Sequence, residues 1–180
     1  MRRLETGGKR TATLPLAGNR DKAPRGNASQ FFVAGELCRR GYSAVVTLGN
    51  TPNVDILCSN RGGNRFAHIQ VKTFRPGDRT CSVGMKAERD NGRSFFWVLA
   101  GIPNPPADKP FEYYVIPARQ MARNVRELHQ TWLNTPGKNG RRHKDSTVRA
   151  VALPPRRSEN NWSIARYRNR WDLIEKRLAV

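Results

Sequence analysis

Residues 53–74, NVDILCSNRGGNRFAHIQVKTF, carry the pattern of a β-hairpin, and this hairpin decides the fold predicted for the whole chain. Residues 54–58 and 66–73 are rich in apolar and β-branched side chains, which favours two strands. Gly62 and Gly63 lie between them and supply the positive φ angles that a two-residue hairpin turn requires. We therefore expect two antiparallel strands joined by a tight turn.

The register of this hairpin brings polar side chains together on one face. With a two-residue turn Arg61 pairs with Asn64, and the same register places Asp55 opposite Gln70, about 5 Å apart at Cβ. Lys72 follows Gln70 by two residues and shares its face, because strand side chains alternate with a period of two. A carboxylate and an amide oxygen are ligands for a hard divalent cation, and an ammonium group beside them stabilises charge on phosphate.

This arrangement resembles the PD-(D/E)XK nuclease superfamily. The family pattern is an Asp at the end of one strand, a (D/E/Q)-x-K tripeptide on the next strand, and a Glu on a preceding helix. The matching positions in this chain are Asp55, the tripeptide Gln70-Val71-Lys72, and Glu36. The order of helix, strand and hairpin strand carries more of the resemblance than the short motif does.

The resemblance covers about residues 27–132 and departs from the family at two points. Gln70 replaces the commoner acid, a variant that the family tolerates but that removes a negative charge from the metal site. The family's Pro before the Asp is displaced, because Pro52 lies three residues ahead of Asp55.

The resemblance implies an α/β fold with a restriction-endonuclease-like mixed central sheet flanked by helices. It also implies hydrolysis of phosphodiester bonds in DNA, with Mg²⁺ or Mn²⁺ as cofactor. Asp55 and Gln70 would supply side-chain ligands, and Val71 its backbone carbonyl. Glu36 would bind a water or a second ion, and Lys72 would orient the attacking water and offset charge on the scissile phosphate.

The resemblance also leaves a rival interpretation open. The chain could be a catalytically inactive nuclease fold that only binds nucleic acid, and the missing negative charge at Gln70 favours this alternative. Many members of the superfamily act as dimers, so a homodimer is also an expectation, although the sequence indicates no dimer interface.

Glu36 admits two interpretations. It lies outside the apolar arc of its predicted helix, toward Arg39 and Arg40, where a solvated ion pair would form. Against this stands the scarcity of acids, since Glu36 and Asp55 are the only acids among residues 23–76. In so basic a stretch, isolated acids favour a functional role.

Composition favours one domain with a polyanionic partner. The 180 residues carry 33 Lys and Arg against 14 Asp and Glu, a net charge of +19, and such an excess is usually kept for nucleic acid. Residues 1–26 are predicted to be a flexible basic N-terminal arm, and residues 27–180 the nuclease-like domain. Asn27 suits the cap of a helix over residues 28–40.

The cysteines and the apolar pattern indicate the cellular compartment in which the protein is expected. Three cysteines without a C-x-x-C pair disfavour a disulfide framework or a zinc site and favour reduced thiols in the cytoplasm. No long apolar run predicts a membrane span, and the N-terminal segment lacks the apolar core of a secretory signal.

The second half of the chain predicts the rest of the sheet and its covering helix. Residues 95–102, FFWVLAGI, form a continuous apolar run that is typical of a central strand buried on both faces. Further strands are expected at residues 42–48, 81–85, 112–116 and 151–153, and a terminal helix near Trp171.

A second helix is predicted to open at Pro117, because apolar residues recur at helical spacing from there to Trp132. Residues 134–149 follow it as a basic loop with no sign of a folded element. The candidate phosphate contacts are Arg119 and Arg123 on the helix and Arg141, Arg142 and Lys144 in the loop.

Overall fold

The structure is a computed structural model that describes residues 23–47, 51–106 and 109–179. Its centre is a five-stranded mixed sheet in the order β1-β2-β3-β5-β6. The strands are β1 (Ser43–Val46), β2 (Ile56–Ser59), β3 (Phe66–Phe74), β5 (Phe95–Gly101) and β6 (Glu112–Pro117). β3 and β5 are parallel, and the other neighbours in this sheet are antiparallel.

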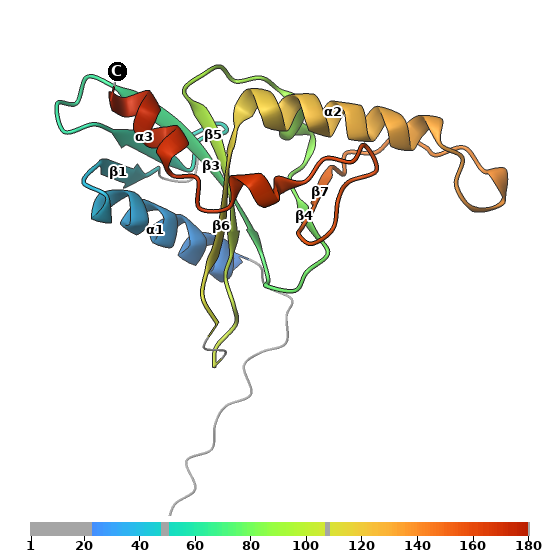
Figure 1. Cartoon of the computed structure of the whole chain (residues 1–180), viewed down its shortest axis with the longest axis horizontal. Helices are drawn as coiled ribbons and strands as arrows, with labels where there is room; N and C mark the ends of the chain where they lie inside the picture. Colours follow the sequence, from blue (N-terminus) through green and yellow to red (C-terminus); the bar gives the residue numbers. More distant parts are fainter. Residues whose placement is uncertain (1–22, 48–50, 107–108, 180) are drawn as a thin grey trace, which may run out of the picture.

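Helices cover both faces of the sheet, which confirms the predicted fold class (Figure 1). α1 (Ala23–Arg39) and α3 (Asp172–Ala179) lie on one face, and α2 (Ala118–Asn134) lies on the other. A small antiparallel sheet of β4 (Thr80–Ser82) and β7 (Ala150–Ala152) lies on the α2 side. Three short 3-10 helices complete the described chain: η1 (Met85–Glu88), η2 (Lys138–Gly140) and η3 (Ile164–Tyr167).

Strand alternation divides the buried side chains into two cores. Ile69 and Val71 of β3 pack with α1 and α3, whereas Phe74 of the same strand packs with α2 and β7. β5 is buried along its whole length and contributes to both cores, as its continuous apolar run predicted. Gln70 and Lys72, which alternate with Ile69 and Val71, therefore belong to the α2 face.

The hairpin register is confirmed, although its turn differs from the prediction. Ile56 lies opposite Ile69, the register that the two-residue turn implied. The connection is nevertheless a four-residue loop, because the amide of Asn60 bonds the carbonyl of Arg65 at 3.2 Å. Of the two glycines only Gly63 has a positive φ, 64°. The side chain of Asn60 closes the loop by accepting the amides at positions 64 and 65, a role that glycine spacing does not reveal.

The first helix begins earlier than predicted. α1 starts at Ala23, so Asn27 lies inside the helix instead of capping it, and the last four residues of the predicted arm are helical. Pro24 explains the difference, since proline is favoured in the first turn, where its missing N–H costs no hydrogen bond. Residues 1–22 of the predicted arm lie outside the described residues.

Two other segments refine the prediction. The strand expected at residues 81–85 is β4, Thr80–Ser82, and η1 begins at Met85. The basic loop after α2 contains the short turn η2, with Asn139 at a φ of 63°. Within the described part of the chain, no helix has the length and apolar character needed to cross a bilayer.

Candidate active site

Asp55 lies where β2 begins, and its backbone is bonded on both sides. Its carbonyl accepts from the amide of Thr47 at 2.9 Å, and its amide donates to the carbonyl of Ile69 at 2.9 Å. The residue therefore sits between the end of β1 and the middle of β3. Because these bonds hold the backbone of Asp55, they also fix the direction in which its side chain leaves the strand.

The Asp55 carboxylate continues the β2–β3 pairing beyond the backbone ladder. Its Oδ2 accepts from the amide of Val71 at 2.7 Å and also from the side-chain amide of Gln70. The N–H and C=O of a strand residue point to the same side, so the Val71 carbonyl is directed toward β2 as well. The structure thus brings together the carboxylate, the side-chain amide and one backbone carbonyl.

Burial dominates the electrostatics of Asp55. It raises the pKa of the carboxyl above its ordinary value, against the hydrogen bond from Val71, the charges of Lys72 and Lys86, and the hydrogen bond from Gln70. A half-buried carboxylate with a raised pKa beside two cations is a combination that functional sites use.

Lys72 supplies one of these two cations. It lies two residues beyond Gln70 on the same face of β3, and its charge acts on Asp55. Its ammonium has no hydrogen-bond or ion-pair partner among the described residues, so it is available to an anion.

Lys86 is a second cation that the sequence did not single out. It lies on η1, is exposed, and lowers the pKa of Asp55 through its charge. Because η1 packs against α2, the fold brings this residue to the hairpin from a segment with no recognisable motif. No signal in the sequence would have found it.

Glu36 requires a correction, because the structure does not bring it to this site. Its helix packs on Ile69 and Val71, on the face of the sheet opposite to Gln70 and Lys72. The carboxylate accepts from Nε of Arg39 at 2.8 Å and from Nε of Arg40 at 2.8 Å.

The surroundings of Glu36 form an ion-pair network of their own. Arg40 also donates to Glu175 of α3 at 2.9 Å, so the network joins α1 to α3. The hydrogen bond from Arg39, together with Arg40, holds the pKa of Glu36 below its ordinary value. The contacts of Glu36 in the structure are therefore those that the ion-pair interpretation of the sequence expected.

The donor set at Asp55 fits a hard divalent cation in kind. Oδ2 of Asp55 already accepts two hydrogen bonds. The oxygens that remain to bind a cation are Oδ1 of Asp55, the side-chain oxygen of Gln70 and the backbone carbonyl of Val71. These are the oxygen ligands that Mg²⁺ takes. The set carries one negative charge, and the described residues contain no cluster of three or more His, Cys, Asp or Glu side chains that could hold a metal.

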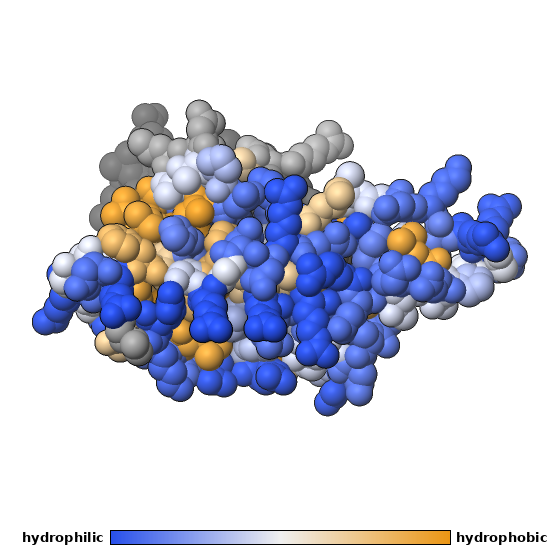
Figure 2. Space-filling model, turned by 90° about the horizontal axis from the view of Figure 1, so that it is seen from above, coloured by the Kyte–Doolittle hydropathy of each residue, from blue (hydrophilic) through white to orange (hydrophobic). Residues whose placement is uncertain are grey.

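The predicted phosphate contacts are all exposed, but they do not gather at Asp55. Arg119 and Arg123 lie on α2, where Arg123 is paired with Glu127 at 3.0 Å. The loop that carries the other three, Arg141, Arg142 and Lys144, lies beyond the far end of α2, away from the central sheet (Figure 1). Hydrophilic side chains cover most of the face over α2, with an isolated apolar area toward its C-terminal end (Figure 2).

Comparison with solved structures finds two nucleases. The bacterial homing endonuclease I-Ssp6803I superposes with a TM-score of 0.52 and 15% identity, over 88% of this chain and 96% of that one. Hjc, a Holliday junction resolvase from Archaeoglobus fulgidus, gives a TM-score of 0.40 and 16% identity, over 71% and 84%. No family model and no curated protein matches the sequence. The first likeness shows the fold, which is the restriction-endonuclease-like mixed α/β fold that the resemblance implied.

Proposed function

We propose that this protein is a nuclease that hydrolyses phosphodiester bonds of DNA with the help of Mg²⁺ or Mn²⁺. One observation carries the proposal: Asp55 accepts hydrogen bonds from both Gln70 and the Val71 amide, with the free ammonium of Lys72 on the same face. The fold supports the proposal, because a homing endonuclease has a similar fold.

The roles follow from the chemistry of each group. Asp55, Gln70 and the Val71 carbonyl would hold the cation, which when bound supplies Lewis acidity and a nucleophilic hydroxide. Lys72 would orient the water and offset the charge that develops on the scissile phosphate. Lys86 would add positive charge on the η1 side, where the phosphate backbone approaches. Glu36 has no role in this proposal.

The net charge of +19 supports DNA as the partner. The proposed phosphate contacts on α2 and its following loop are Arg119, Arg123, Arg141, Arg142 and Lys144, all of them exposed. We place the activity in the cytoplasm, which agrees with three cysteines that form no disulfide. A homodimer is proposed from the resemblance alone, and the sedimentation coefficient of the full chain tests it.

A binding-only nuclease fold is the second candidate, and one observation favours it. The site has a single carboxylate, and burial raises its pKa, which weakens the charge available to a cation. The substrate phosphate would have to complete the ligand set, as it commonly does for Mg²⁺.

The deciding experiment measures cleavage of duplex, branched and single-stranded DNA in Mg²⁺ and in Mn²⁺. Asp55→Asn should lower cleavage by about two orders of magnitude or more, while binding without metal holds or improves, because an acid facing phosphates is neutralised. Lys72→Met should lower cleavage with little change in binding. The exposed Asp90→Asn serves as the matched control and should cleave normally.

Gln70→Glu separates the two candidates. It adds a carboxylate to the site and should shift the Mg²⁺ dependence of cleavage to lower concentration. If the wild type cuts no DNA in either metal and Gln70→Glu gains no activity, the binding module replaces the nuclease. If Asp55→Asn cuts as well as the wild type, the catalytic site lies elsewhere.

A further inference from the structure

A cavity of about 590 Å³ lies apart from Asp55, between the C-terminal half of α2 and the small β4-β7 sheet. This volume is within the range of small-molecule sites. Its apolar wall includes Val125 and Leu128 of α2, with Ala152 of β7 opposite. Val148, whose side chain is 65% exposed, adds an apolar surface at the mouth.

Positive charge surrounds this apolar wall. Arg79 and Arg156 line the cavity, and neither guanidinium has a hydrogen-bond or ion-pair partner among the described residues. Arg157 lines it too and makes only long contacts to Asn161, at 3.3 and 3.4 Å. The one acid in the lining is Glu159, which is exposed.

Arg149 differs from these arginines because it already has an ion-pair partner. It is 5% exposed and is paired with Glu88 of η1, and it also donates to the carbonyls of Ser146 and Val148. This buried pair ties the cavity wall to η1, the helix that brings Lys86 to Asp55. The cavity and the candidate active site therefore lie on the same side of the central sheet, joined through η1.

Ser158 indicates that the cavity takes a polar atom. Its side chain is 8% exposed and lines the cavity, yet its hydroxyl has no hydrogen-bond partner among the described residues. The backbone of Ser158 is held, since its amide donates to Trp162 at 2.9 Å and its carbonyl accepts from Asn161 at 2.8 Å. A buried hydroxyl without a partner is costly, and a rotation about χ1 that turns it toward the cavity would let a ligand atom satisfy it as donor or acceptor.

We propose that this cavity binds a single nucleotide, and that its source is an unpaired nucleotide of the DNA substrate. The base would occupy the apolar wall with one polar edge on Ser158, and the phosphate would face Arg79 and Arg156. This combination of apolar contact, edge hydrogen bond and phosphate charge is how proteins hold an extruded nucleotide. The inference rests on the proposed nuclease function for its choice of DNA over a free mononucleotide.

Unpaired nucleotides are favoured because a paired base would first have to leave its stack, which costs a few kcal/mol. The cavity would thus direct the enzyme to DNA with a bulge, a flap or an overhang near the cleavage position. Neither the PD-(D/E)XK motif nor the metal ligands account for such a preference.

The test measures binding of the full-length protein in EDTA, so that no cleavage is needed. The probes are a duplex with one bulged 2-aminopurine, the same duplex fully paired, and free 2-aminopurine deoxynucleoside monophosphate. The bulged duplex should bind about tenfold more tightly than the paired one, the factor expected for one well-made base contact. The fluorescence of the bulged base should change on binding.

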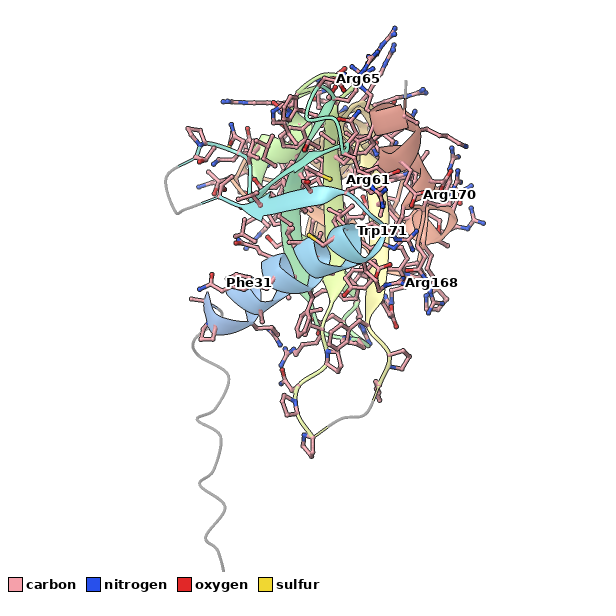
Figure 3. The ribbon with its side chains drawn as sticks, turned by 90° about the vertical axis from the view of Figure 1, so that its left-hand side faces the viewer. Phe31, Arg61, Arg65, Arg168, Arg170 and Trp171 are labelled. Carbon is pink, nitrogen blue, oxygen red and sulfur yellow. The ribbon has the colours of Figure 1, made fainter. Side chains whose placement is uncertain are left out.

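Variants locate the site. Ser158→Ala and the cavity-filling Ala152→Phe should abolish the preference for the bulge, with thermal unfolding reporting whether each variant is folded. The Arg79→Ala/Arg156→Ala variant should weaken the bulged duplex more than the paired one. Arg61→Ala/Arg65→Ala is the charge-matched control, because both arginines are exposed, lack side-chain partners among the described residues and project from the β2–β3 turn (Figure 3).

The outcomes separate the possibilities. Tight binding of the free monophosphate that Ala152→Phe abolishes, without a bulge preference, keeps the nucleotide site and overturns DNA as its source. Equal affinity for both duplexes together with no binding of the monophosphate overturns the proposal. A bulge preference in a protein that cuts nothing supports the cavity while the nuclease function fails, so the two failures remain distinct.

Discussion

At the scale of single residues, Asp55 combines a proposed catalytic role with a cost to stability. Its carboxylate is half-buried, and burial outweighs the hydrogen bonds and cations that favour its ionised form. A folded-state pKa above the unfolded value means that ionisation destabilises the fold. Sites that hold such groups exchange stability for activity.

Asp55→Asn should therefore stabilise the protein at neutral pH. Because the folded pKa is raised, the wild type has its full Asp55 contribution below the ordinary value of 3.8 and loses it as the pH rises through the raised pKa. Asn keeps an oxygen for the Val71 amide but cannot ionise. The difference in Tm between variant and wild type should be small at pH 3 and should grow in favour of the variant toward pH 7.

Thermal unfolding of both proteins across this pH range checks the prediction, with Asp90→Asn as the exposed control. A Tm difference that shrinks as the pH rises would contradict the raised pKa.

At the scale of elements, β5 is buried within both cores, and ion pairs join α1 to α3. β5 lies between β3 and β6 and faces both cores, so every residue from Phe95 to Gly101 is buried. α1 is joined to α3 through Glu36, Arg40 and Glu175. Each element supports one prediction.

Val98→Asp should destabilise the fold by several kcal/mol, the range typical of an unpaired buried charge. Val98 is fully buried at the centre of β5. Val45→Asp is the matched control, since Val45 is 64% exposed on the edge strand β1 and should change stability by about 0.5 kcal/mol or less. Urea denaturation measures both, and a Val98→Asp protein of wild-type stability would show that β5 is not central.

Glu36→Gln should lower stability by about 1 kcal/mol or less and leave cleavage at the wild-type rate. The variant removes the carboxylate that Arg39 and Arg40 share, on the face of the sheet away from Asp55. Glu127→Gln, which breaks the exposed pair with Arg123 on α2, is the control. A large loss of cleavage by a folded Glu36→Gln variant would show that Glu36 takes part in catalysis, as the family resemblance implied.

At the scale of the whole molecule, positive charge is spread over several faces. Figure 3 shows Arg61 and Arg65 near the β2–β3 turn and Arg168 and Arg170 near the last helix, while other basic residues lie along α2 and the loop beyond it. Arg170 is neutralised by Asp172 at 2.7 Å. Net charge therefore predicts a polyanionic partner, but it does not locate the surface that binds it.

The salt dependence of DNA binding locates that surface. The slope of log K against log salt is about 0.9 for each phosphate neutralised on duplex DNA. Arg141→Ala/Arg142→Ala/Lys144→Ala should weaken binding and flatten the slope by up to that amount for each phosphate that the variant no longer neutralises. Arg61→Ala/Arg65→Ala/Arg168→Ala removes the same charge from other parts of the surface and should flatten the slope less. Equal slopes for the two triple variants would show that the loop has no special role in binding phosphate.

The sequence alone predicted the β2–β3 hairpin, the buried strand β5 and the meeting of Asp55 with Gln70. The period of two along residues 66–74 places Gln70 and Lys72 on one face, and pairing across the turn places Asp55 against them. The continuous apolar run of β5 leaves no polar side to expose, so its central position followed as well. These features depend on neighbours in the chain, and local periodicity is sufficient to specify them.

Only the tertiary structure decided what lies on each side of that sheet. A helical wheel gives the apolar arc of α1 but not the sheet face it covers, and that choice separates Glu36 from Asp55. The charge of Lys86 acts on Asp55, and the unpartnered Ser158 lines a cavity, because η1, α2 and β7 pack together from segments far apart in the sequence. Such placements depend on how whole elements pack, which no local pattern encodes.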